Sequence, residues 1–424
     1  MNIYQYLEKF DKFTKDPTLE VMEYFMNKLN VPLDKIKFIH IAGTNGKGSV
    51  TEMLTNILIK SRYKVGKYMS PHLIKLNERI SINNQQITDD QIEEILKDLS
   101  IFIDEYNKKH EIKVKWFEVI TSVALIYFAK QNCDFVILET GLGGLTDCTN
   151  IVKPIISVIT SIGLDHMDIL GNDILKIAKH KAGIIKQGSD TVFFEKQDIL
   201  EYISNYCKEK NNKLHLVRKS DIHNYSYNYE YQTFTYKEFK DIKINLKGKK
   251  QIYNASLCLE CINILLDKGY IIDEDAVIRG LQTVIHKGRF EIINQKPRII
   301  FDGAHNQDSI NNLIETINQY YPNEKRIYII SILKSKDYKT VLKSILNDRN
   351  ALFFLTSGND INRYVCKEEL YKTSIEYMPN NKIFKNTLND SIDIAIKKYN
   401  NYTIFIIGSF YVYKTVTDKI NSKG

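Results

Sequence analysis

The residues best suited to chemistry lie in one short segment: Gly43, Thr44, Asn45, Gly46, Lys47, Gly48 and Ser49. Glycine lets a backbone come close to an anion and turn its N–H groups toward it. Lys47 can reach a terminal phosphate, and Ser49 can coordinate a metal ion. These residue types in this order predict a site that binds a nucleoside triphosphate.

The elements on either side of this loop place it at the start of a helix. The apolar run at residues 38–41 predicts a strand, and apolar residues recur at helical spacing after Lys47. A helix N-terminus adds positive potential where the loop would hold phosphate. The spacing differs from the usual G-x-x-x-x-G-K-[ST] loop, because Gly48 stands between Lys47 and Ser49. The alternative is a plain glycine turn between a strand and a helix.

Composition bounds the class of protein. With 424 residues the chain is long enough for two domains, and 43% hydrophobic and 26% charged residues are ordinary for a globular protein. No apolar run approaches the ~20 residues that span a bilayer, and residues 1–12 lack a signal-peptide core. We therefore expect a cytoplasmic protein without a membrane partner. The net charge of +8 comes from scattered lysines, so it favours anionic small substrates over nucleic acid.

The cysteines do not indicate a metal site. Cys258 and Cys261 have the spacing of a metal or redox pair, but they lie in a helical apolar pattern and no second pair follows. Buried free thiols are the expected outcome.

The order of elements predicts an α/β protein. Residues 38–185 alternate strand and helix patterns, which is typical of βαβ units and a mostly parallel sheet. Tyrosines stand at the odd-numbered positions from 225 to 231, whereas Phe234 and Tyr236 stand at even-numbered positions. This change predicts a hairpin or bulge on a half-exposed sheet. A polar turn precedes a new strand at 299–301, and the alternation then resumes. We place the domain boundary at residue 293 and expect a smaller doubly wound domain over 294–424.

Polar residues stand where the predicted strands end. Glu139 closes one strand, and Asp165 and His166 follow another. Ligands of parallel sheets bind beyond the carboxyl ends of the strands. With Ser49 or Ser70, these side chains would offer oxygen and imidazole ligands to Mg²⁺. Solvated surface charges are the alternative. In the second domain, Asp302 could bind a nucleotide; the alternative is that Asp302 or Asn306 caps the following helix.

These residues together resemble the folylpolyglutamate synthases and dihydrofolate synthases, members of the Mur ligase superfamily. The resemblance runs nearly end to end and depends on the joint order and spacing of the motifs. They are residues 40–49, 70–73, 78–80, 117–118, 138–144, 147, 149–150, 163–166, 181–184, 251, 254–255, 288–291, 302–306 and 408–409.

The resemblance implies a fold and a reaction. The fold is a P-loop-type, mostly parallel sheet domain over 1–293, followed by a Rossmann-like α/β domain over 294–424, with the site in the cleft between them. The reaction is ATP-dependent addition of L-glutamate to folylpolyglutamate, to dihydropteroate or to both, through an acyl phosphate. The implied cofactors are ATP and two Mg²⁺ ions. We expect a monomer that acts on small molecules.

The resemblance also implies roles for single residues. Lys47, Lys181 and His166 would be catalytic, and Lys181 matches a lysine that the family carries as a carbamate. The phosphates would lie on residues 43–49. The other implied positions are Asn254, Arg289 and Asp302 for the nucleotide, Ser70, Glu139 and His166 for the metal ions, and Phe117, Glu118, Thr146, Asp147, Cys148 and His305 for the substrates.

Several positions depart from the family pattern. Leu145 stands where the family has Arg, His180 where it has Glu, and residues 286–287 where it has Trp-Pro. Loss of the Arg removes a positive donor beside the expected substrate loop. Two alternatives therefore stay open: a Mur-superfamily ligase with a different carboxylic acid substrate, and an ATP-switched protein that binds RNA through its tyrosine-rich segment.

Overall fold

The computed structural model describes residues 3–11, 18–358 and 360–422. It divides into two compact units, the first made of Met1–Tyr227, Tyr231–Asn245 and Ile252–Val284, and the second of Asn228–Glu230, Leu246–Gln251 and Ile285–Gly424. The sequence places a boundary at residue 293, whereas the units divide after Val284. The reason is that the strand after Val284 pairs antiparallel with the first parallel strand of the second unit.

The first unit contains most of the elements. Its helices and strands are α1 (Ile3–Leu7), α2 (Glu20–Lys28), β1 (Lys37–Ala42), α3 (Lys47–Lys60), β2 (Val65–Tyr68), β3 (Ile80–Ile82), β4 (Gln85–Gln86), α4 (Asp89–Lys109), α5 (Trp116–Lys130), β5 (Phe135–Glu139), β6 (Pro154–Ile159), α6 (Met167–Leu170), α7 (Ile174–Ala182), β7 (Asp190–Phe194), α8 (Gln197–Glu209), β8 (Lys213–Val217), β9 (Ile222–Tyr227), β10 (Gln232–Tyr236), β11 (Phe239–Ile244), α9 (Lys249–Asp267) and α10 (Glu274–Gln282).

The main sheet of this unit has eight strands in the order β4-β3-β2-β5-β1-β6-β7-β8. The strands from β2 to β8 in this order run parallel, and β3 and β4 add an antiparallel edge. Parallel strands end at one edge of their sheet, so the loops that follow β1, β2, β5 and β6 come together. The chain passes from β1 to β2 and returns to place β5 between them. Such a reversal is where open α/β sheets bind ligands.

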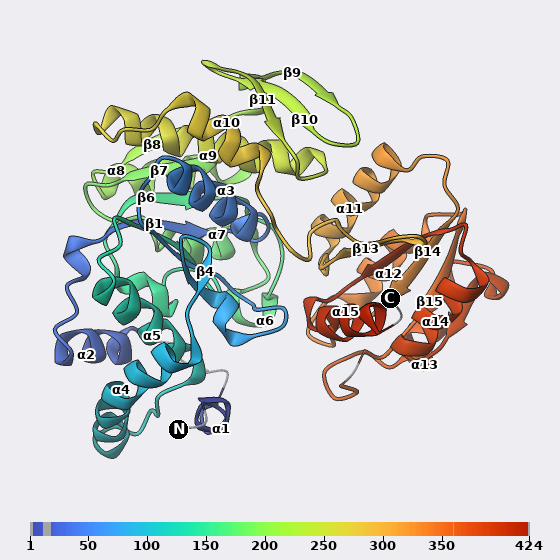
Figure 1. The fold of residues 1–424 in the computed structure, drawn as a ribbon, viewed down its shortest axis with the longest axis horizontal. Coiled ribbons are helices and arrows are strands. Elements are labelled where there is room, and N and C mark those ends of the chain that lie inside the picture. Colours follow the sequence, from blue (N-terminus) through green and yellow to red (C-terminus); the bar gives the residue numbers. More distant parts are fainter. Residues whose placement is uncertain (1–2, 12–17, 359, 423–424) are drawn as a thin grey trace. The chain divides into compact units, whose positions relative to one another are not determined.

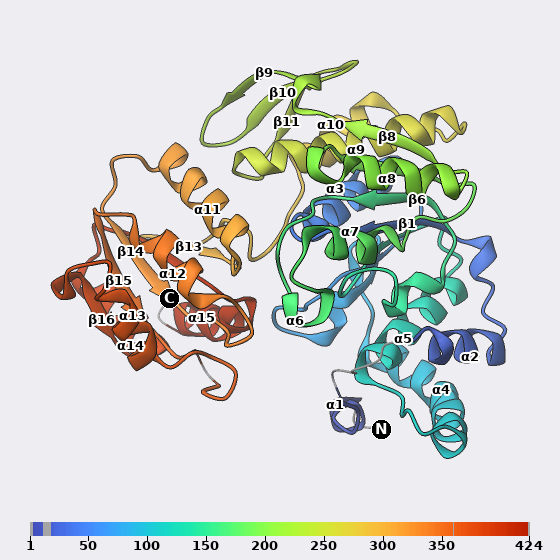
Figure 2. The same cartoon turned by 180° about the vertical axis from the view of Figure 1, so that it is seen from behind.

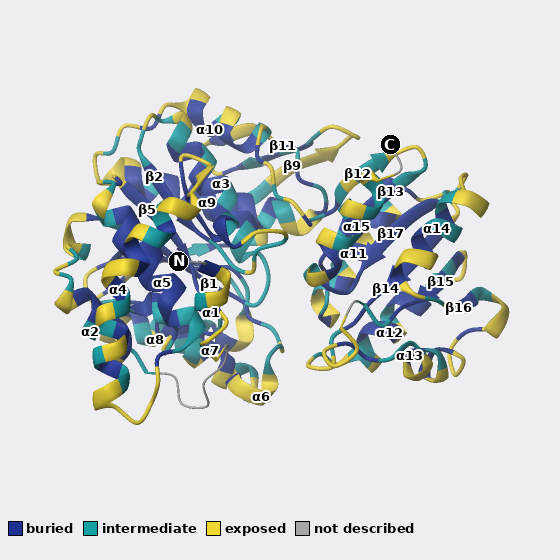
Figure 3. Ribbon diagram, turned by 60° about the horizontal axis from the view of Figure 1, so that its bottom comes forward, coloured by how far each residue is buried: buried dark blue, intermediate teal, exposed yellow. Residues whose placement is uncertain are grey.

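Helices cover both faces of this sheet. Figure 1 shows α3, α9 and α10 on one side of β1 and α2, α4 and α5 on the other. The strands β1, β2 and β5 are dark blue in Figure 3 because nearly all of their residues are buried on both faces. This explains why the sequence of β5 is the uninterrupted apolar run Phe-Val-Ile-Leu, with no polar residue between the apolar ones. The expected strands at 38–41, 134–138 and 155–159 and the helix at 117–130 are confirmed as β1, β5, β6 and α5.

The tyrosine-rich segment forms a separate three-stranded antiparallel sheet in the order β11-β10-β9 (Figure 2). Register shifts interrupt both of its ladders, as the parity change predicts. Tyr225 and Tyr227 of β9 are exposed, whereas Phe234 and Tyr236 of β10 are buried. The prediction of a half-exposed hairpin is therefore confirmed.

The second unit is a smaller α/β domain. Its elements are β12 (Glu291–Gln295), β13 (Arg298–Asp302), α11 (Gln307–Tyr320), β14 (Arg326–Ile330), α12 (Tyr338–Leu346), β15 (Ala351–Leu355), α13 (Lys367–Ser374), β16 (Ile383–Lys385), α14 (Leu388–Lys398), β17 (Thr403–Ile407) and α15 (Tyr413–Asn421). The strand order is β12-β13-β17-β14-β15-β16, with all pairs parallel except β12–β13. Because β17 lies between β13 and β14, this sheet also has a strand-order reversal, as a Rossmann-like fold requires.

Aromatic rings from three neighbouring strands stack at the centre of this second sheet. Tyr328 of β14 stacks on Phe353 of β15 and on Phe405 of β17, with ring centroids 5.7 and 5.5 Å apart. In the described part of the chain, no helix combines the length and the apolar character needed to cross a bilayer.

Candidate active site

The glycine loop leaves β1 and enters α3 at Lys47, where the sequence predicts the helix to begin. Gly46 has a φ of 90°, in the left-handed region that favours glycine. A Cβ at Gly46 would lie 2.5 Å from Oδ1 of Asn254, a residue of α9. A side chain at position 46 would thus be both strained and crowded. The loop therefore holds Asn254 close to the first turn of α3.

The loop is fixed by the segment that follows β6. The Thr44 N–H donates to the carbonyl of Ser161, and the Asn45 N–H donates to Oγ of Ser161 at 3.0 Å. The hydroxyls of Thr160 and Ser161 both donate to the Asn45 carbonyl, at 2.7 and 2.9 Å. A Cβ at Gly43 would lie 1.9 Å from Oγ1 of Thr160. The shape of the loop is therefore set before any ligand binds.

Lys47 lies over this loop. Its Nζ donates to the carbonyl of Gly43 at 3.1 Å, which folds the side chain back across residues 43–46. Ser49 is buried in the first turn of α3. Gly46 has no side chain to cap that turn, so backbone N–H groups at the start of α3 are suited to an anion.

Glu139 and Ser70 meet at the same edge of the sheet. Glu139 ends β5 and is 4% exposed, and its Oε2 accepts from the Ser70 N–H at 3.3 Å. Ser70 follows β2, which is the neighbour of β5. A carboxylate beside a serine is an oxygen donor set of the kind that Mg²⁺ prefers.

His166 lies in the segment that follows β6. It precedes α6 and has φ 50° and ψ 43°, a left-handed conformation that is uncommon for a residue with a side chain. Such outliers concentrate at functional sites. Across the described ranges, no three or more His, Cys, Asp and Glu side chains form a group that could hold a metal ion.

Lys181 is buried in the last turn of α7, with 3% of its surface exposed. Burial, together with the positive charge of Lys47, lowers the pKa of Lys181 to about 7, although Asp165 and Asp147 act in the opposite direction. A lysine with this pKa is partly neutral at physiological pH. Its amine is then available as a nucleophile.

The expected substrate residues gather around the loop after β5. A Cβ at Gly141 would lie 2.5 Å from Cζ of Phe117. Glu118 is buried in the first turn of α5, and burial raises its pKa to about 7 although the Lys115 N–H donates to it. Asp147 accepts from the Leu142 N–H at 2.8 Å, and Cys148 follows it. Thr146 precedes Asp147 and is half-buried.

Two expected nucleotide residues and His305 meet at one end of the second unit. Asp302 ends β13, where its two oxygens accept from the N–H groups of Phe290 and Ala304, both at 2.8 Å. Burial raises the pKa of the Asp302 carboxyl, although the Arg289 charge opposes this. The Arg289 guanidinium lies 4.3 Å from the ring centroid of Phe410. The His305 ring centroid is 6.1 Å from that of Phe410. Of the two capping candidates in this segment, Asn306 caps α11 and Asp302 does not.

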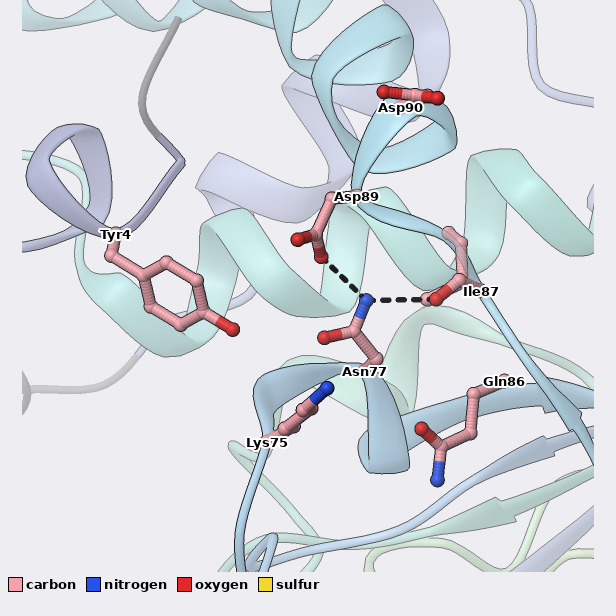
Figure 4. Close-up of a pocket in the computed structure, with 7 residues that line it drawn as sticks. All are labelled: Tyr4, Lys75, Asn77, Gln86, Ile87, Asp89 and Asp90. Atoms are coloured by element: carbon pink, nitrogen blue, oxygen red, sulfur yellow. Dashed lines mark hydrogen bonds between the residues drawn. The ribbon is translucent and has the colours of Figure 1, made fainter.

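A polar pocket lies elsewhere in the first unit. This pocket of about 440 Å³ adjoins the start of α4, and Asn77 in it donates to the Ile87 carbonyl and to Asp89 Oδ1, both at 2.8 Å (Figure 4). It is lined by Tyr4, Lys75, Asn77, Gln86, Ile87, Asp89 and Asp90. None of these residues is an expected site residue.

Some residues that shape the site are absent from the sequence expectations. Thr160 and Ser161 fix the glycine loop, and their only signal is their position at a strand end. His40 and Thr149 contact each other although they lie 109 residues apart. A histidine in an apolar strand is a weak signal for such a contact.

Comparison with known proteins agrees with this geometry. Residues 41–262 match the Mur ligase middle domain, and residues 288–410 match the Mur ligase glutamate ligase domain. A dihydrofolate synthase/folylpolyglutamate synthase of Bacillus subtilis is 33% identical over 422 residues, which cover 96% of each chain. The chain therefore belongs to the Mur ligase family of ATP-dependent ligases, in its dihydrofolate synthase/folylpolyglutamate synthase branch. The resemblance drawn from the sequence is confirmed.

Solved structures share the whole fold. Mycobacterium tuberculosis folylpolyglutamate synthase complexed with ADP and AMPPCP matches with a TM-score of 0.89 at 25% identity, covering 98% of this chain and 97% of that one. Escherichia coli FolC in complex with DHPP and ADP matches with a TM-score of 0.85 at 28% identity, covering 99% and 97%. The predicted fold class, a P-loop-type parallel sheet domain followed by a smaller Rossmann-like domain, is also confirmed.

Proposed function

We propose that this chain uses ATP to join L-glutamate to dihydropteroate, to folylpolyglutamate or to both. The observation that carries the proposal is the preformed glycine loop of residues 43–49, which lies at the same sheet edge as Glu139 and Ser70. We assign nucleotide binding to residues 1–293 and the glutamate ligase domain to residues 294–424.

The first step activates an acid. A carboxylate oxygen of the acid attacks the γ-phosphorus of ATP, an O–P bond forms, the bond to the β-phosphate oxygen breaks, and ADP leaves. The N–H groups of residues 43–49 would hold the phosphates, with Lys47 exchanging its Gly43 carbonyl for a phosphate oxygen. Asn254, Arg289 and Asp302 would contact the rest of the nucleotide.

The second step forms the amide. The amine of glutamate attacks the acyl carbon and loses a proton, and phosphate leaves with the former carboxylate oxygen. Phe117, Glu118, Thr146, Asp147 and Cys148 would hold the acid. His305 would contact substrate from the second unit. Exclusion of water from the acyl phosphate would protect it from hydrolysis.

We propose that this site binds two Mg²⁺ ions. The Glu139 carboxylate, the Ser70 hydroxyl and the His166 imidazole are the ligands that we propose. The hydrogen bond from the Ser70 N–H to Glu139 supports the choice of the first two, because it keeps these residues next to each other. When bound, the ions would neutralise negative charge on the phosphoryl oxygens.

We also propose that Lys181 carries a carbamate. A neutral amine attacks CO₂, a C–N bond forms, and one proton is released. The depressed pKa and deep burial of Lys181 support this chemistry. The carbamate would replace the positive charge of Lys181 by a negative one near Lys47, whose charge acts on Lys181.

The most similar alternative is a ligase of the same family with another carboxylic acid substrate. Leu145 supports it, because an apolar side chain that is 46% exposed stands where the family has Arg. Assays with a panel of carboxylic acids distinguish the folate ligase from a ligase with another substrate. We expect ADP release only when L-glutamate is supplied together with a pteroate or folate acid. ADP release with muramyl precursors and another amine, and none with pteroates, would establish the alternative.

We further propose that the enzyme works as a monomer in the cytoplasm. Six free cysteines are consistent with a reducing compartment, and its proposed substrates and ATP are small anions that suit a chain of net charge +8.

A further inference from the structure

His40 is a polar residue at the centre of the main sheet. It lies in β1, opposite Leu138 of β5 and Ser157 of β6, and is 0% exposed. Nothing in the proposed reaction uses it. A buried imidazole is costly unless its polar atoms are satisfied, so its contacts indicate why it is there.

A short chain of hydrogen bonds begins at this imidazole. Nε2 of His40 lies 2.8 Å from Oγ1 of Thr149. The Thr149 hydroxyl donates to Oδ1 of Asp147 at 2.5 Å, and the Thr149 N–H donates to the same oxygen at 3.1 Å. A hydroxyl has one hydrogen. Because the Thr149 hydrogen points to the carboxylate, its oxygen must accept the hydrogen on Nε2 of His40.

The direction of this chain is fixed by the other imidazole nitrogen. Nδ1 of His40 is buried and has no hydrogen-bond partner among the described residues. The reverse direction would place an N–H at Nδ1 with nothing to accept it, which is costly in a buried site. Burial and the nearby Lys186 charge lower the pKa of His40 to about 3, so the ring is neutral at physiological pH.

Asp147 connects this chain of hydrogen bonds to the substrate loop, which we define as residues 141–148. Its Oδ2 accepts from the Leu142 N–H at 2.8 Å and so closes the loop between its two ends. The Leu145 N–H donates to the His180 carbonyl at 2.7 Å, and the Leu145 carbonyl accepts from Nδ2 of Asn150 at 2.9 Å. The loop is therefore held on one side by α7 and on the other by the chain from His40.

We propose that His40 is a positioning residue, whose Nε2–H orients Thr149 and, through it, Asp147, so that the substrate loop keeps the shape that receives the acid. This inference rests on the proposed function for the identity of the acid. It gives a role to a residue of β1, the strand that precedes the glycine loop, in the part of the site that would bind the acid.

Two pairs of variants test it. His40→Met and Thr149→Val remove one hydrogen bond each at nearly constant volume, whereas His40→Gln and Thr149→Ser keep a donor and a hydroxyl. We expect the first pair to raise the KM for the pteroate or folate acid about tenfold, with the KM for ATP changed less than about twofold. The second pair should restore the acid KM to within about threefold of the wild type.

A measurement without turnover separates this inference from the proposed function. Hydrogen exchange of the peptide covering residues 140–148 should be faster in His40→Met and Thr149→Val, while the peptide covering residues 43–49 keeps wild-type exchange. If the wild type releases no ADP with any pteroate or folate acid, the proposed function fails, and the exchange result still decides the role of His40.

Ser189→Ala provides a matched control. Ser189 is buried, and its Oγ accepts from Nδ2 of Asn212 at 2.9 Å. It stands just before β7, at the end of the parallel strands opposite to the substrate loop. This variant should leave the acid KM and the exchange of residues 140–148 unchanged. The inference is overturned if His40→Met and Thr149→Val fold but alter neither readout. It is equally overturned if exchange rises throughout the first unit, since that would make His40 a residue of general stability.

Discussion

At the scale of single residues, the site depends on backbone geometry as much as on side chains. Gly46 provides both a left-handed φ and the space that Asn254 occupies. Lys47 provides a positive group that contacts a loop carbonyl. Each of these contributions can be removed separately.

Replacing Lys47 by Ala should abolish phosphoryl transfer without unfolding the protein, because its side chain lies on the loop and is only half-buried. We expect kcat to fall by about 100-fold or more, as for loss of one donor to a developing charge. ADP release and circular dichroism measure the two effects. Lys60→Ala, at the exposed C-terminal end of α3, is the control. Turnover of Lys47→Ala near the wild-type rate would contradict the assignment of the loop.

Replacing Gly46 by Ala should weaken nucleotide binding as well as stability. A left-handed alanine costs about 1–2 kcal/mol, and its Cβ would also displace Asn254. Gly188→Ala is the matched control, since Gly188 has a φ of 71° but nothing within 4 Å of the added Cβ. Both variants should melt at lower temperature, and only Gly46→Ala should lose ATP affinity in calorimetry, by about tenfold. Equal ATP affinity in the two variants would show that the loop tolerates a side chain.

At the scale of elements, one buried charge cluster joins β7, β8, α9 and the three-stranded sheet. Nε2 of His215 lies 2.8 Å from Asp190 Oδ1, and Nδ1 lies 3.5 Å from Glu260 Oε1. Lys268 pairs with Asp190, and Lys237 with Glu260, which also accepts from the Tyr236 hydroxyl. A histidine between two carboxylates makes the attachment of these elements depend on pH.

The sign of that dependence follows from the pKa directions. Burial lowers the pKa of His215, but the hydrogen bonds to Glu260 and Asp190 outweigh it and leave the pKa raised. A raised pKa stabilises the fold below the unfolded value of about 6.5 and ceases to do so as pH rises through the folded value. The pKa of Glu260 is lowered to about 2 and that of Asp190 is also lowered, so their contributions are lost only in acid.

We therefore expect the stabilisation that His215 provides, measured as the difference in free energy of unfolding between the wild type and His215→Gln, to fall between pH 6 and pH 9. Urea unfolding at the two pH values measures it. His223→Gln changes an exposed histidine of β9 and serves as the control. If this difference is the same at both pH values, His215 does not make the stability depend on pH.

Elements with a strong local pattern could be predicted, and contacts between distant residues could not. The apolar runs of β1, β5 and β17 and the helical spacing of α5 reflect burial that acts within each segment. The fixing of Asn45 by Ser161 and the His40–Thr149 contact depend on which strands become neighbours, which no local pattern records. The boundary at residue 293 stays a prediction, while β12 joins the second unit through its pairing with β13, which composition does not record.

At the scale of the whole molecule, the two units have the same type of sheet and place polar residues at the same ends of their strands. Each has a mostly parallel sheet with a strand-order reversal, and each ends its strands in polar residues: Glu139 in the first unit and Asp302 in the second. The chain thus carries one set of groups suited to phosphate and metal and another suited to polar ligands. A ligase that must bind a nucleotide, an acid and an amine has use for both.

The most direct test of the central claim is the fate of the acid's carboxylate oxygen. The acid is labelled with ¹⁸O in the carboxylate and incubated with the enzyme, ATP and L-glutamate, and the released phosphate is analysed by mass spectrometry. Acyl phosphate formation predicts one ¹⁸O atom in each phosphate, in step with the amide formed. Amide formation with unlabelled phosphate, or ADP release that does not depend on the acid, would contradict the account.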